Sequence, residues 1–254
     1  MIDTHCHLTD PRLQSQLAGV LTRAAANGVS RMITIGTDFA DAHRAIELCH
    51  QLPNVRCAVG VHPNYTQNVD IADLPKLREI QADPSVLALG EMGLDYFHQH
   101  ADRDKQHAAF EFQLGLASEL GRPVVIHSRE AIDDTLVHLR NFPKISAVFH
   151  CFTGTVAEAG KILEAGFRIG FDGPITYKKS DSLREVVWMT PEDRILLETD
   201  SPYLTPEPMR KQKVNEPGLV KHVAEMIAQV KRWSYEQTDA ITTANAERFF
   251  GWPA

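Results

Sequence analysis

The sequence lacks the features that would place this protein in a membrane, outside the cell or along duplex nucleic acid. None of the apolar runs in its 254 residues approaches the roughly 18 residues of a membrane span. The first residues also lack the basic stretch and apolar core of a signal peptide, so we expect a cytoplasmic protein with no membrane partner. The net charge of −7 argues against broad contact with duplex nucleic acid but leaves room for local capture of a phosphate.

Cysteine pairs and linkers are missing as well. The four cysteines form no CxxC pair, which excludes a zinc ribbon and a dithiol redox motif. No linker rich in proline, glycine or serine, no low-complexity tract and no charge block marks a domain boundary. We therefore expect a single domain over residues 1–254, with reduced, partly buried thiols, and nothing indicates an obligate protein partner.

What the sequence does contain is a repeated alternation of short apolar runs with longer amphipathic ones. Apolar strands separated by helices predict a parallel sheet covered on both faces. About eight such repeats in this length are typical of an α/β fold of the (β/α)8 TIM-barrel type, with a doubly wound open sheet as the rival. The expected strands are Met1–Thr4, Arg31–Gly36, Val55–Val61, Val86–Gly90, Pro123–Ile126, Ala147–Phe149, Phe167–Phe171 and Ile195–Glu198, and the expected helices include Leu13–Asn27, Asp41–Leu52, Asp102–Leu120, Glu130–Phe142, Val156–Ala165, Leu219–Lys231 and Tyr235–Phe250.

Two histidines stand at the end of the first expected strand. Alternate residues of a strand point to the same face, so we expect His5 and His7 to project together. Cys6 between them should point the other way, into the packing. Two neighbouring imidazoles supply half of a site for a transition metal.

Four later strands also end in an ionisable side chain. The glycines at 90 and 93 should let the backbone turn tightly and present the acidic side chain between them. Polar residues at the C-terminal ends of barrel strands are typical of an active site. The metal-ligand candidates are therefore His5, His7, Glu91, His127, His150 and Asp200.

Five short motifs spread over nearly the whole chain carry this chemistry. They are DTHCH at 3–7, GEMGLDY at 90–96, IHSR at 126–129, FHCFTG at 149–154 and ETDSPYL at 198–204. In this order they resemble the motifs of the TatD family of metal-dependent deoxyribonucleases, with Asn215-Glu216-Pro217 and Asn245 near the expected tail motifs. The resemblance implies a TIM-barrel hydrolase of the wider amidohydrolase group that cleaves phosphodiester bonds with divalent metals.

One position departs from the family pattern. A basic residue often precedes the Asn-Glu-Pro motif, where this chain has Val214. Lys213 or Arg210 is the candidate substitute as a phosphate contact, and a different substrate preference is the alternative. The departure concerns the substrate rather than the metal site.

The ligand inventory, in agreement with the family, predicts two divalent ions of Zn²⁺, Mn²⁺ or Mg²⁺. We expect His5, His7 and Asp200 to hold one ion, and His127 and His150 to hold the other. Paired ions about 3.5–4 Å apart lower the pKa of a water molecule and hold the attacking and leaving oxygens.

Two carboxylates are expected to take part in catalysis. Glu91 lies on an intermediate strand and is expected to bridge both ions through its two oxygens. Asp200 is expected to act as a ligand and as the general base that accepts the proton of the water. Two ions and these two carboxylates leave a surplus of positive charge that favours an anionic phosphodiester.

Other residues near the strand ends are candidates for substrate contacts. His62 is expected to contact a phosphate or to form a structural hydrogen bond, and Arg129 to bind phosphate or pair with a carboxylate. Asp95 and Tyr96 are expected to line the mouth, with Tyr96 either stacking on a base or packing. Glu198 is expected to orient a ligand or the water.

Two groups of charged residues receive a plainer interpretation. The basic run at 210–213 follows the last strand and is either a phosphate-binding loop or a solvated loop. His98, His100 and His107 form a cluster in the sequence, but they fall in a polar loop and at a helix start, so we expect solvated histidines.

The leading hypothesis is a nuclease that removes nucleotides from a single-stranded end of DNA or RNA. An acidic protein with a deep site suits a strand end or a short oligonucleotide better than a long duplex. The first alternative is hydrolysis of an amide, lactone or ester on the same metals, including the aminoacyl ester of tRNA, because a barrel fold does not determine the substrate. The second is a non-catalytic protein that binds nucleic acid or a partner, which the intact ligand set disfavours.

Overall fold

The computed structural model describes residues 1–252, in which eight parallel strands alternate with helices. The strand order follows the sequence from β1 to β8, which is the topology of a (β/α)8 barrel, so the predicted fold class is confirmed. A doubly wound sheet is excluded, because its strand order departs from the sequence. The chain divides into two compact units, unit 1 with Met1–Thr34 and Cys151–Ala254, and unit 2 with Ile35–His150. That the whole chain forms one domain stays a prediction.

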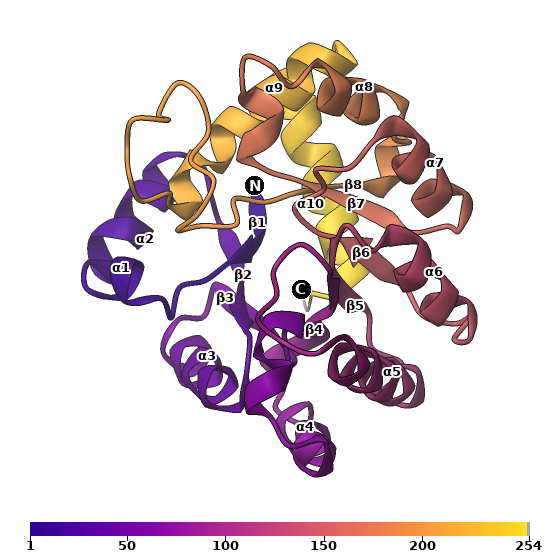
Figure 1. Cartoon of the computed structure of the whole chain (residues 1–254). Helices are drawn as coiled ribbons and strands as arrows, with labels where there is room; N and C mark the ends of the chain where they lie inside the picture. Colours follow the sequence, from indigo (N-terminus) through magenta and orange to yellow (C-terminus); the bar gives the residue numbers. More distant parts are fainter. Residues whose placement is uncertain (253–254) are drawn as a thin grey trace. The chain divides into compact units, whose positions relative to one another are not determined.

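Unit 2 contains the middle strands and the helices that follow them. Neighbouring strands pair in parallel from β3 to β6. Helix α3 packs on β3, α5 on β4 and α6 on β5 (Figure 1). The elements are the end of β2 (Arg31–Gly36), α3 (Phe39–Gln51), β3 (Val55–Val59), η1 (Pro63–Asn68), η2 (Ile71–Lys76), α4 (Leu77–Ile80), β4 (Val86–Asp95), α5 (Arg103–Leu120), β5 (Val124–Arg129), α6 (Ile132–Arg140) and β6 (Ala147–Phe149).

Unit 1 contains the first and the last strands. Strand β1 pairs with β2, and β7 with β8, in both cases in parallel. A bridge between Cys6 and Ser201 joins β1 to the segment after β8. The C-terminal helix α10, coloured yellow in Figure 1, packs on β8 and β1. The elements are β1 (Ile2–Cys6), α1 (Pro11–Gln14), α2 (Leu17–Ala26), the start of β2, α7 (Val156–Glu164), β7 (Arg168–Phe171), η3 (Gly173–Thr176), α8 (Asp181–Met189), η4 (Glu192–Arg194), β8 (Ile195–Leu197), η5 (Pro217–Leu219), α9 (Val220–Lys231) and α10 (Tyr235–Phe250).

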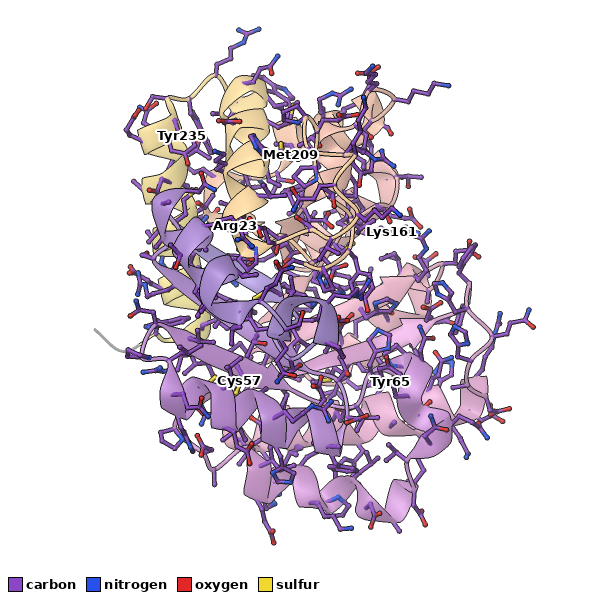
Figure 2. All side chains as sticks on the ribbon, turned by 90° about the vertical axis from the view of Figure 1, so that its left-hand side faces the viewer. Arg23, Cys57, Tyr65, Lys161, Met209 and Tyr235 are labelled. Carbon is purple, nitrogen blue, oxygen red and sulfur yellow. The ribbon has the colours of Figure 1, made fainter. Side chains whose placement is uncertain are left out.

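The strands are buried along most of their length, as continuous apolar runs in the sequence predict. All ten residues of β4 are buried. Cys57 on β3, labelled in Figure 2, is fully buried in unit 2. The cysteines are free thiols, and Cys151 is half-buried whereas the other three are buried. The core of each unit therefore lies around the strands that carry the candidate ligands.

Side-chain caps determine where several helices begin. Asp102 accepts hydrogen bonds from the backbone N–H groups of the first turn of α5, and Gly121 ends that helix in the left-handed conformation. Capping boxes begin α7 at Thr155 and α10 at Ser234. Tyr235, labelled in Figure 2 in the first turn of α10, donates its hydroxyl to the sulfur of Met1. Short polar signals in the sequence thus account for the helix starts.

Three strands extend beyond their predicted ends. β1 continues to Cys6, β4 to Asp95 and β5 to Arg129, so three candidate ligands, His5, Glu91 and His127, lie inside strands rather than after them. The expected tight turn at Gly90 and Gly93 was wrong. Both glycines have a positive φ, and the register of β4 against β5 shifts between Leu89 and Met92. Glycine therefore produces an irregularity within a continuing strand instead of a turn.

Two differences concern whole helices. The segment Leu13–Asn27 is two helices, α1 and α2, because the chain breaks at Ser15 and Gln16. Helix α8 was not expected.

Within residues 1–252, no helix has both the length and the apolar content that a membrane crossing needs.

Replacing Gly93 by alanine should strongly destabilise the protein. Its φ is 143°, and an added Cβ would overlap the carbonyl oxygen of His127 on the neighbouring strand. We expect a loss of at least about 3 kcal/mol in the free energy of unfolding, from strain and forced displacement together. Gly121→Ala is the matched control, because its φ is also positive at 65° but nothing lies within 4 Å of the added carbon. The control should lose only about 1 kcal/mol in urea unfolding, and equal losses would contradict the explanation.

Candidate metal centre

In unit 1, two imidazoles meet one carboxylate. The Nε2 atoms of His5 and His7 lie 3.6 Å and 3.3 Å from Oδ1 of Asp200. The two imidazole rings are 5.2 Å apart, as expected for alternate residues of β1. Cys6 between them points away and donates its thiol to the carbonyl of Ile33. We call His5, His7 and Asp200 the first cluster.

Backbone hydrogen bonds hold the first cluster together. The N–H of Asp200 donates to the carbonyl of His5 at 2.9 Å, and the N–H of His7 donates to the carbonyl of Ser201 at 2.7 Å. Asp200 has a φ of 53°, a conformation that is uncommon for a residue other than glycine. These contacts keep the carboxylate and both imidazoles in place even though nearly two hundred residues separate them.

A network of buried side chains holds the segment that leads from β8 to Asp200. Asp3 accepts hydrogen bonds from the hydroxyl and the N–H of Thr199, at 2.6 Å and 2.9 Å. The amide of Asn215 donates to the carbonyls of Thr199 and Tyr203 at 2.9 Å and 2.6 Å. Burial raises the pKa of Asp3 to about 7 despite these hydrogen bonds. Asp3 and Asn215 therefore brace the strand end that presents Asp200.

In unit 2, three imidazoles converge on one carboxylate oxygen. Oε1 of Glu91 lies 2.6 Å from Nε2 of His150, 2.8 Å from Nδ1 of His127 and 3.3 Å from Nε2 of His62. Burial alone would raise the pKa of Glu91, but the imidazoles, His150 foremost, lower it well below its ordinary value. We call Glu91, His62, His127 and His150 the second cluster.

His127 lies between two carboxylates. Its Nδ1 faces Glu91, and its Nε2 is hydrogen-bonded to Oδ2 of Asp95 at 3.0 Å. Burial opposes the charged form of His127, but the hydrogen bonds to Asp95 and Glu91 outweigh it and raise the pKa to about 9. A carboxylate on the far nitrogen of a histidine is the usual way in which proteins orient a metal-binding imidazole.

Both clusters have the donor chemistry of a divalent metal site. One ligand atom from each of His5, His7 and Asp200 lies within 4.8 Å of the others, and the same holds for His62, Glu91 and His127. Imidazole nitrogens with a carboxylate oxygen suit Zn²⁺ or Mn²⁺. The imidazole nitrogens around Glu91 and those around Asp200 each share a carboxylate oxygen as a neighbour, so the residues present fit a bound ion.

A family model described as TatD related DNase matches residues 2–251 of this chain. The chain belongs to the TatD related DNase family. The resemblance inferred from the motifs is thereby confirmed, together with the class of metal-dependent hydrolase.

Individual TatD-family proteins are similar over the full length. The metal-dependent hydrolase YabD of Bacillus subtilis is 38% identical, and the match covers 98% of each chain. The protein named 3'-5' ssDNA/RNA exonuclease TatD from Erwinia tasmaniensis is 35% identical over 98% of this chain and 99% of its own. The crystal structure of YJJV, a TatD homolog from Escherichia coli, superposes with a TM-score of 0.93 at 28% identity, covering 100% of this chain and 98% of that one. The barrel fold is therefore that of solved TatD-family structures.

The residues predicted to touch substrate in this TatD-family chain have other contacts of their own. Asp95 is fully buried and is hydrogen-bonded to both His127 and His98. Tyr96 donates its hydroxyl to Asp134, and the guanidinium of Arg103 lies 4.1 Å from its ring centroid, which covers one face of the ring.

His62 and Glu198 are also held by neighbours. His62 accepts a hydrogen bond from the N–H of Asn64, and burial lowers its pKa although the charge of Glu91 opposes this. Glu198 is fully buried and accepts a hydrogen bond from the N–H of Cys151. The roles predicted for His62 and Glu198 stay predictions. Their hydrogen bonds to neighbouring residues favour a role in orienting other groups of the site.

Three exposed aromatic residues were not singled out from the sequence. Tyr65 lies 5.7 Å from the ring of His62, and Tyr203 lies 5.8 Å from the ring of His7. Phe97 is 54% exposed and lies beneath the guanidinium of Arg129. The available signal was their position next to motif residues, since each follows a candidate ligand or contact by a few positions.

His107 was expected to be solvated, and this was wrong. It is hydrogen-bonded to the hydroxyl of Tyr96 at 2.9 Å and to His138 at 2.8 Å. The reason is that α5 and α6 bring the two histidines together, which sequence spacing does not reveal. His98 and His100 are exposed, as expected.

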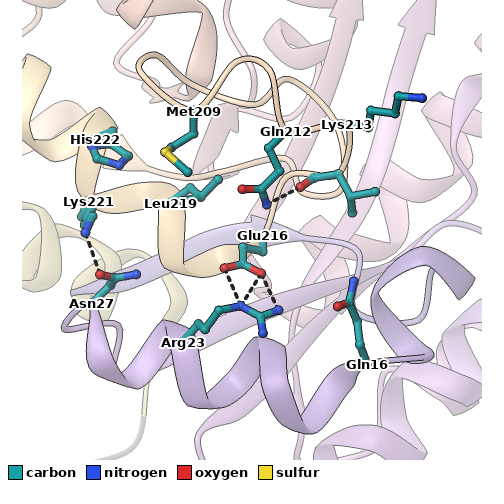
Figure 3. A pocket seen from close by; sticks show the side chains of 11 residues that line it. Gln16, Arg23, Asn27, Met209, Gln212, Lys213, Glu216, Leu219, Lys221 and His222 are labelled. Carbon is teal, nitrogen blue, oxygen red and sulfur yellow. Dashed lines mark hydrogen bonds and ion pairs between the residues drawn. The ribbon is translucent and has the colours of Figure 1, made fainter.

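The residues of the basic run 210–213 have different contacts, one with an aromatic ring and another with a cavity. The guanidinium of Arg210 stacks 3.5 Å from the ring centroid of Tyr177. Lys213 lines a cavity of about 520 Å³ in unit 1, in which Glu216 binds Arg23 through two oxygens at 2.8–3.0 Å (Figure 3). Val214 lines the same cavity, so the position that is often basic in relatives faces it here. Arg210 and Lys213 therefore lie in different surroundings.

Replacing Asp95 by asparagine should lower the pKa of His127 from about 9 toward its ordinary 6.5 in metal-free protein. Protonated His127 stabilises the wild type below pH 6.5, and this contribution is lost as the pH rises through 9. Between pH 6.5 and 9, the free energy of unfolding should therefore fall less steeply in the variant than in the wild type. The variant should also bind zinc roughly 10–100-fold more weakly.

The pKa is read from NMR titration of the imidazole protons, and the affinity from competition with a chelator. Asp73→Asn is the control, because Asp73 is exposed and its ion pair with Lys76 lies on the surface. An unchanged His127 pKa in Asp95→Asn would show that this carboxylate does not act on the imidazole.

Proposed function

We propose that this protein is a divalent-metal-dependent exonuclease that removes nucleotides from the 3′ end of single-stranded DNA or RNA. The observation that carries the proposal is the convergence of three imidazole nitrogens on Oε1 of Glu91. Membership of the TatD family supports it, and so does the name of the Erwinia tasmaniensis relative, a 3'-5' ssDNA/RNA exonuclease. A cytoplasmic location agrees with this function and remains a prediction.

Each cluster is proposed to hold one divalent ion. His5, His7 and Asp200 supply two nitrogens and a carboxylate for one ion, and His127, His150 and Glu91 supply the ligands of the other. A bound divalent ion supplies Lewis acidity, which polarises a phosphodiester and lowers the pKa of water. The bridging role of Glu91 between the two ions and the choice among Zn²⁺, Mn²⁺ and Mg²⁺ stay predictions.

The protein's own groups are proposed to move the proton and to hold the strand. Asp200 accepts the proton of the attacking water. Backbone hydrogen bonds fix the position of this residue, and its carboxylate lies beside the imidazoles of the first cluster. His62 contacts a phosphate oxygen of the substrate. Arg129 pairs with phosphate, and exposed Phe97 and Tyr203 offer rings on which bases stack.

The charge distribution favours a strand end over a duplex. A net charge of −7 repels the backbone of a long nucleic acid, so binding depends on local groups at the site. The guanidinium groups of Arg129, over the ring of Phe97, and of Arg12, over the ring of Tyr203, are candidates to hold one phosphate each.

Asp200→Asn should reduce nucleotide release from single-stranded DNA by roughly 10²- to 10⁴-fold, because the substitution removes the base and weakens a ligand. The assay follows a 5′-labelled oligonucleotide with Mg²⁺, Mn²⁺ or Zn²⁺, so that stepwise shortening reports attack from the 3′ end. Asp181→Asn is the matched control in the same unit, since the Asp181 side chain is 93% exposed. Its activity should equal that of the wild type.

A substrate panel separates this function from acyl hydrolysis. Phosphodiesters should be cleaved, whereas lactones, cyclic amides and aminoacyl-tRNA should not. No nucleotide release with any of the three metals, in protein shown to hold metal, would contradict the proposal. Cleavage of an acyl substrate instead would show that the same site catalyses the alternative reaction, hydrolysis of an amide, lactone or ester.

A further inference from the structure

A third group of metal-binding atoms lies in the interior of unit 1. The sulfur of Cys151, a carboxylate oxygen of Asp172 and one of Asp200 all lie within 4.8 Å of one another. Cys151 stands before α7 in the left-handed conformation with a φ of 45°, and Asp172 directly follows β7. Neither Cys151 nor Asp172 has a part in the hydrolysis described above.

Asp172 has no counterpart for its charge. Its side chain is completely buried, and neither carboxylate oxygen has a hydrogen-bond partner within residues 1–252, apart from the approach of the weakly donating thiol of Cys151. An ionised carboxylate without a partner in a protein interior is strongly unfavourable, so such groups are paired, protonated or bound to a metal.

Other negative groups surround Asp172. Glu198 is fully buried on the same side, and its oxygens lie where a side chain at Gly170 would point. Asp3 and Asp200 also add to the unfavourable charge that Asp172 experiences. Within residues 1–252, no imidazole is a hydrogen-bond partner of Asp172 as His127 is of Glu91, so a bound cation would stabilise this carboxylate.

We propose that Cys151, Asp172 and Asp200 bind a third divalent cation of the Zn²⁺ class. Zinc bonds of about 2.3 Å to sulfur and about 2.0–2.2 Å to oxygen place neighbouring ligand atoms about 3.5 Å apart in a tetrahedron. The three ligand atoms lie within 4.8 Å of one another without an ion, so binding requires them to draw closer by up to about 1.3 Å. A thiolate favours a borderline ion such as Zn²⁺, Co²⁺ or Cd²⁺ over Mg²⁺.

Binding is accompanied by release of protons to solvent. The S–H bond of Cys151 breaks as the sulfur–metal bond forms, and protonated Asp172 loses its proton in the same way. No electron transfer is involved. Asp200 has two oxygens, and Oδ1 is the one that faces His5 and His7. One carboxylate can therefore belong to the first cluster and to the third site together.

The proposal requires neither a nucleic-acid substrate nor hydrolysis, so it stands apart from the proposed function. Cobalt is a suitable probe, because a thiolate bound to Co²⁺ gives a sulfur-to-metal charge-transfer absorption that nitrogen and oxygen ligands do not give. Full-length protein freed of metal is titrated with Co²⁺ while this absorption and the bound metal are measured. Saturating Co²⁺ should produce the absorption in the wild type.

Two variants test the ligands separately. Cys151→Ser should abolish the absorption, and Asp172→Asn should weaken the Co²⁺ affinity of this site at least tenfold. Zinc content measured by mass spectrometry should fall by one ion per chain in each variant. Cys49→Ser is the matched control, because Cys49 is also a free thiol and lies on α3 in unit 2, and it should keep the absorption.

Thermal unfolding gives a second measurement. Without metal, Asp172→Asn should have a melting temperature at least equal to that of the wild type, since it removes an unpartnered carboxylate. With zinc, its gain in melting temperature should be smaller. If Asp172→Asn does not fold, the Cys151→Ser spectrum and zinc content decide the question.

Two results would overturn the proposal. One is the absence of the charge-transfer absorption in the wild type at saturating Co²⁺. The other is an unchanged zinc content in both variants, which would mean that Asp172 simply carries a proton toward the Cys151 thiol. Either result leaves the nuclease assay unaffected, so failure here and failure of the proposed function are distinguishable.

Discussion

Two largely buried carboxylates, Glu91 and Asp200, have imidazole nitrogens as their neighbours. The local structure of each unit depends on this pairing of a carboxylate with imidazoles. An ionised carboxylate in an interior needs partners that compensate for lost hydration. Glu91 obtains them from three histidines and Asp200 from two. Imidazole is also a common metal ligand, so the arrangement that stabilises the buried carboxylates also forms the candidate metal centre.

The surrounding residues fix the direction of these side chains. In unit 2, Asp95 binds the far nitrogen of His127, and a backbone position that only glycine accepts at Gly93 lets β4 pass close to His127. In unit 1, Asp3 and Asn215 hold the strand end before Asp200 through the hydroxyl, N–H and carbonyl of Thr199. Ligands supported in this way lose little freedom when an ion binds, and this favours affinity and a defined geometry.

The two units differ in how they balance charge. In unit 2 the buried acid Glu91 is surrounded by bases. In unit 1, Asp172 is buried and has neither an ion pair nor a strong hydrogen bond within the described part of the chain. This asymmetry follows from the residues after β6, β7 and β8, which are Cys151, Asp172 and Asp200, and it is the reason why a further cation is a reasonable occupant of unit 1.

The sequence by itself determined the fold class, the family and the ligand candidates. Strand and helix alternation depends on local hydrophobic pattern, and motif residues such as His5 and His7 share a face because of strand periodicity alone. Only the tertiary structure decided that β4 continues through Glu91, that Asp95 binds His127 rather than facing outward, and that Asp172 is buried without a partner. These features depend on strand register and on side chains brought together from distant parts of the chain, as Asp3 and Thr199 are, and no local pattern records such contacts.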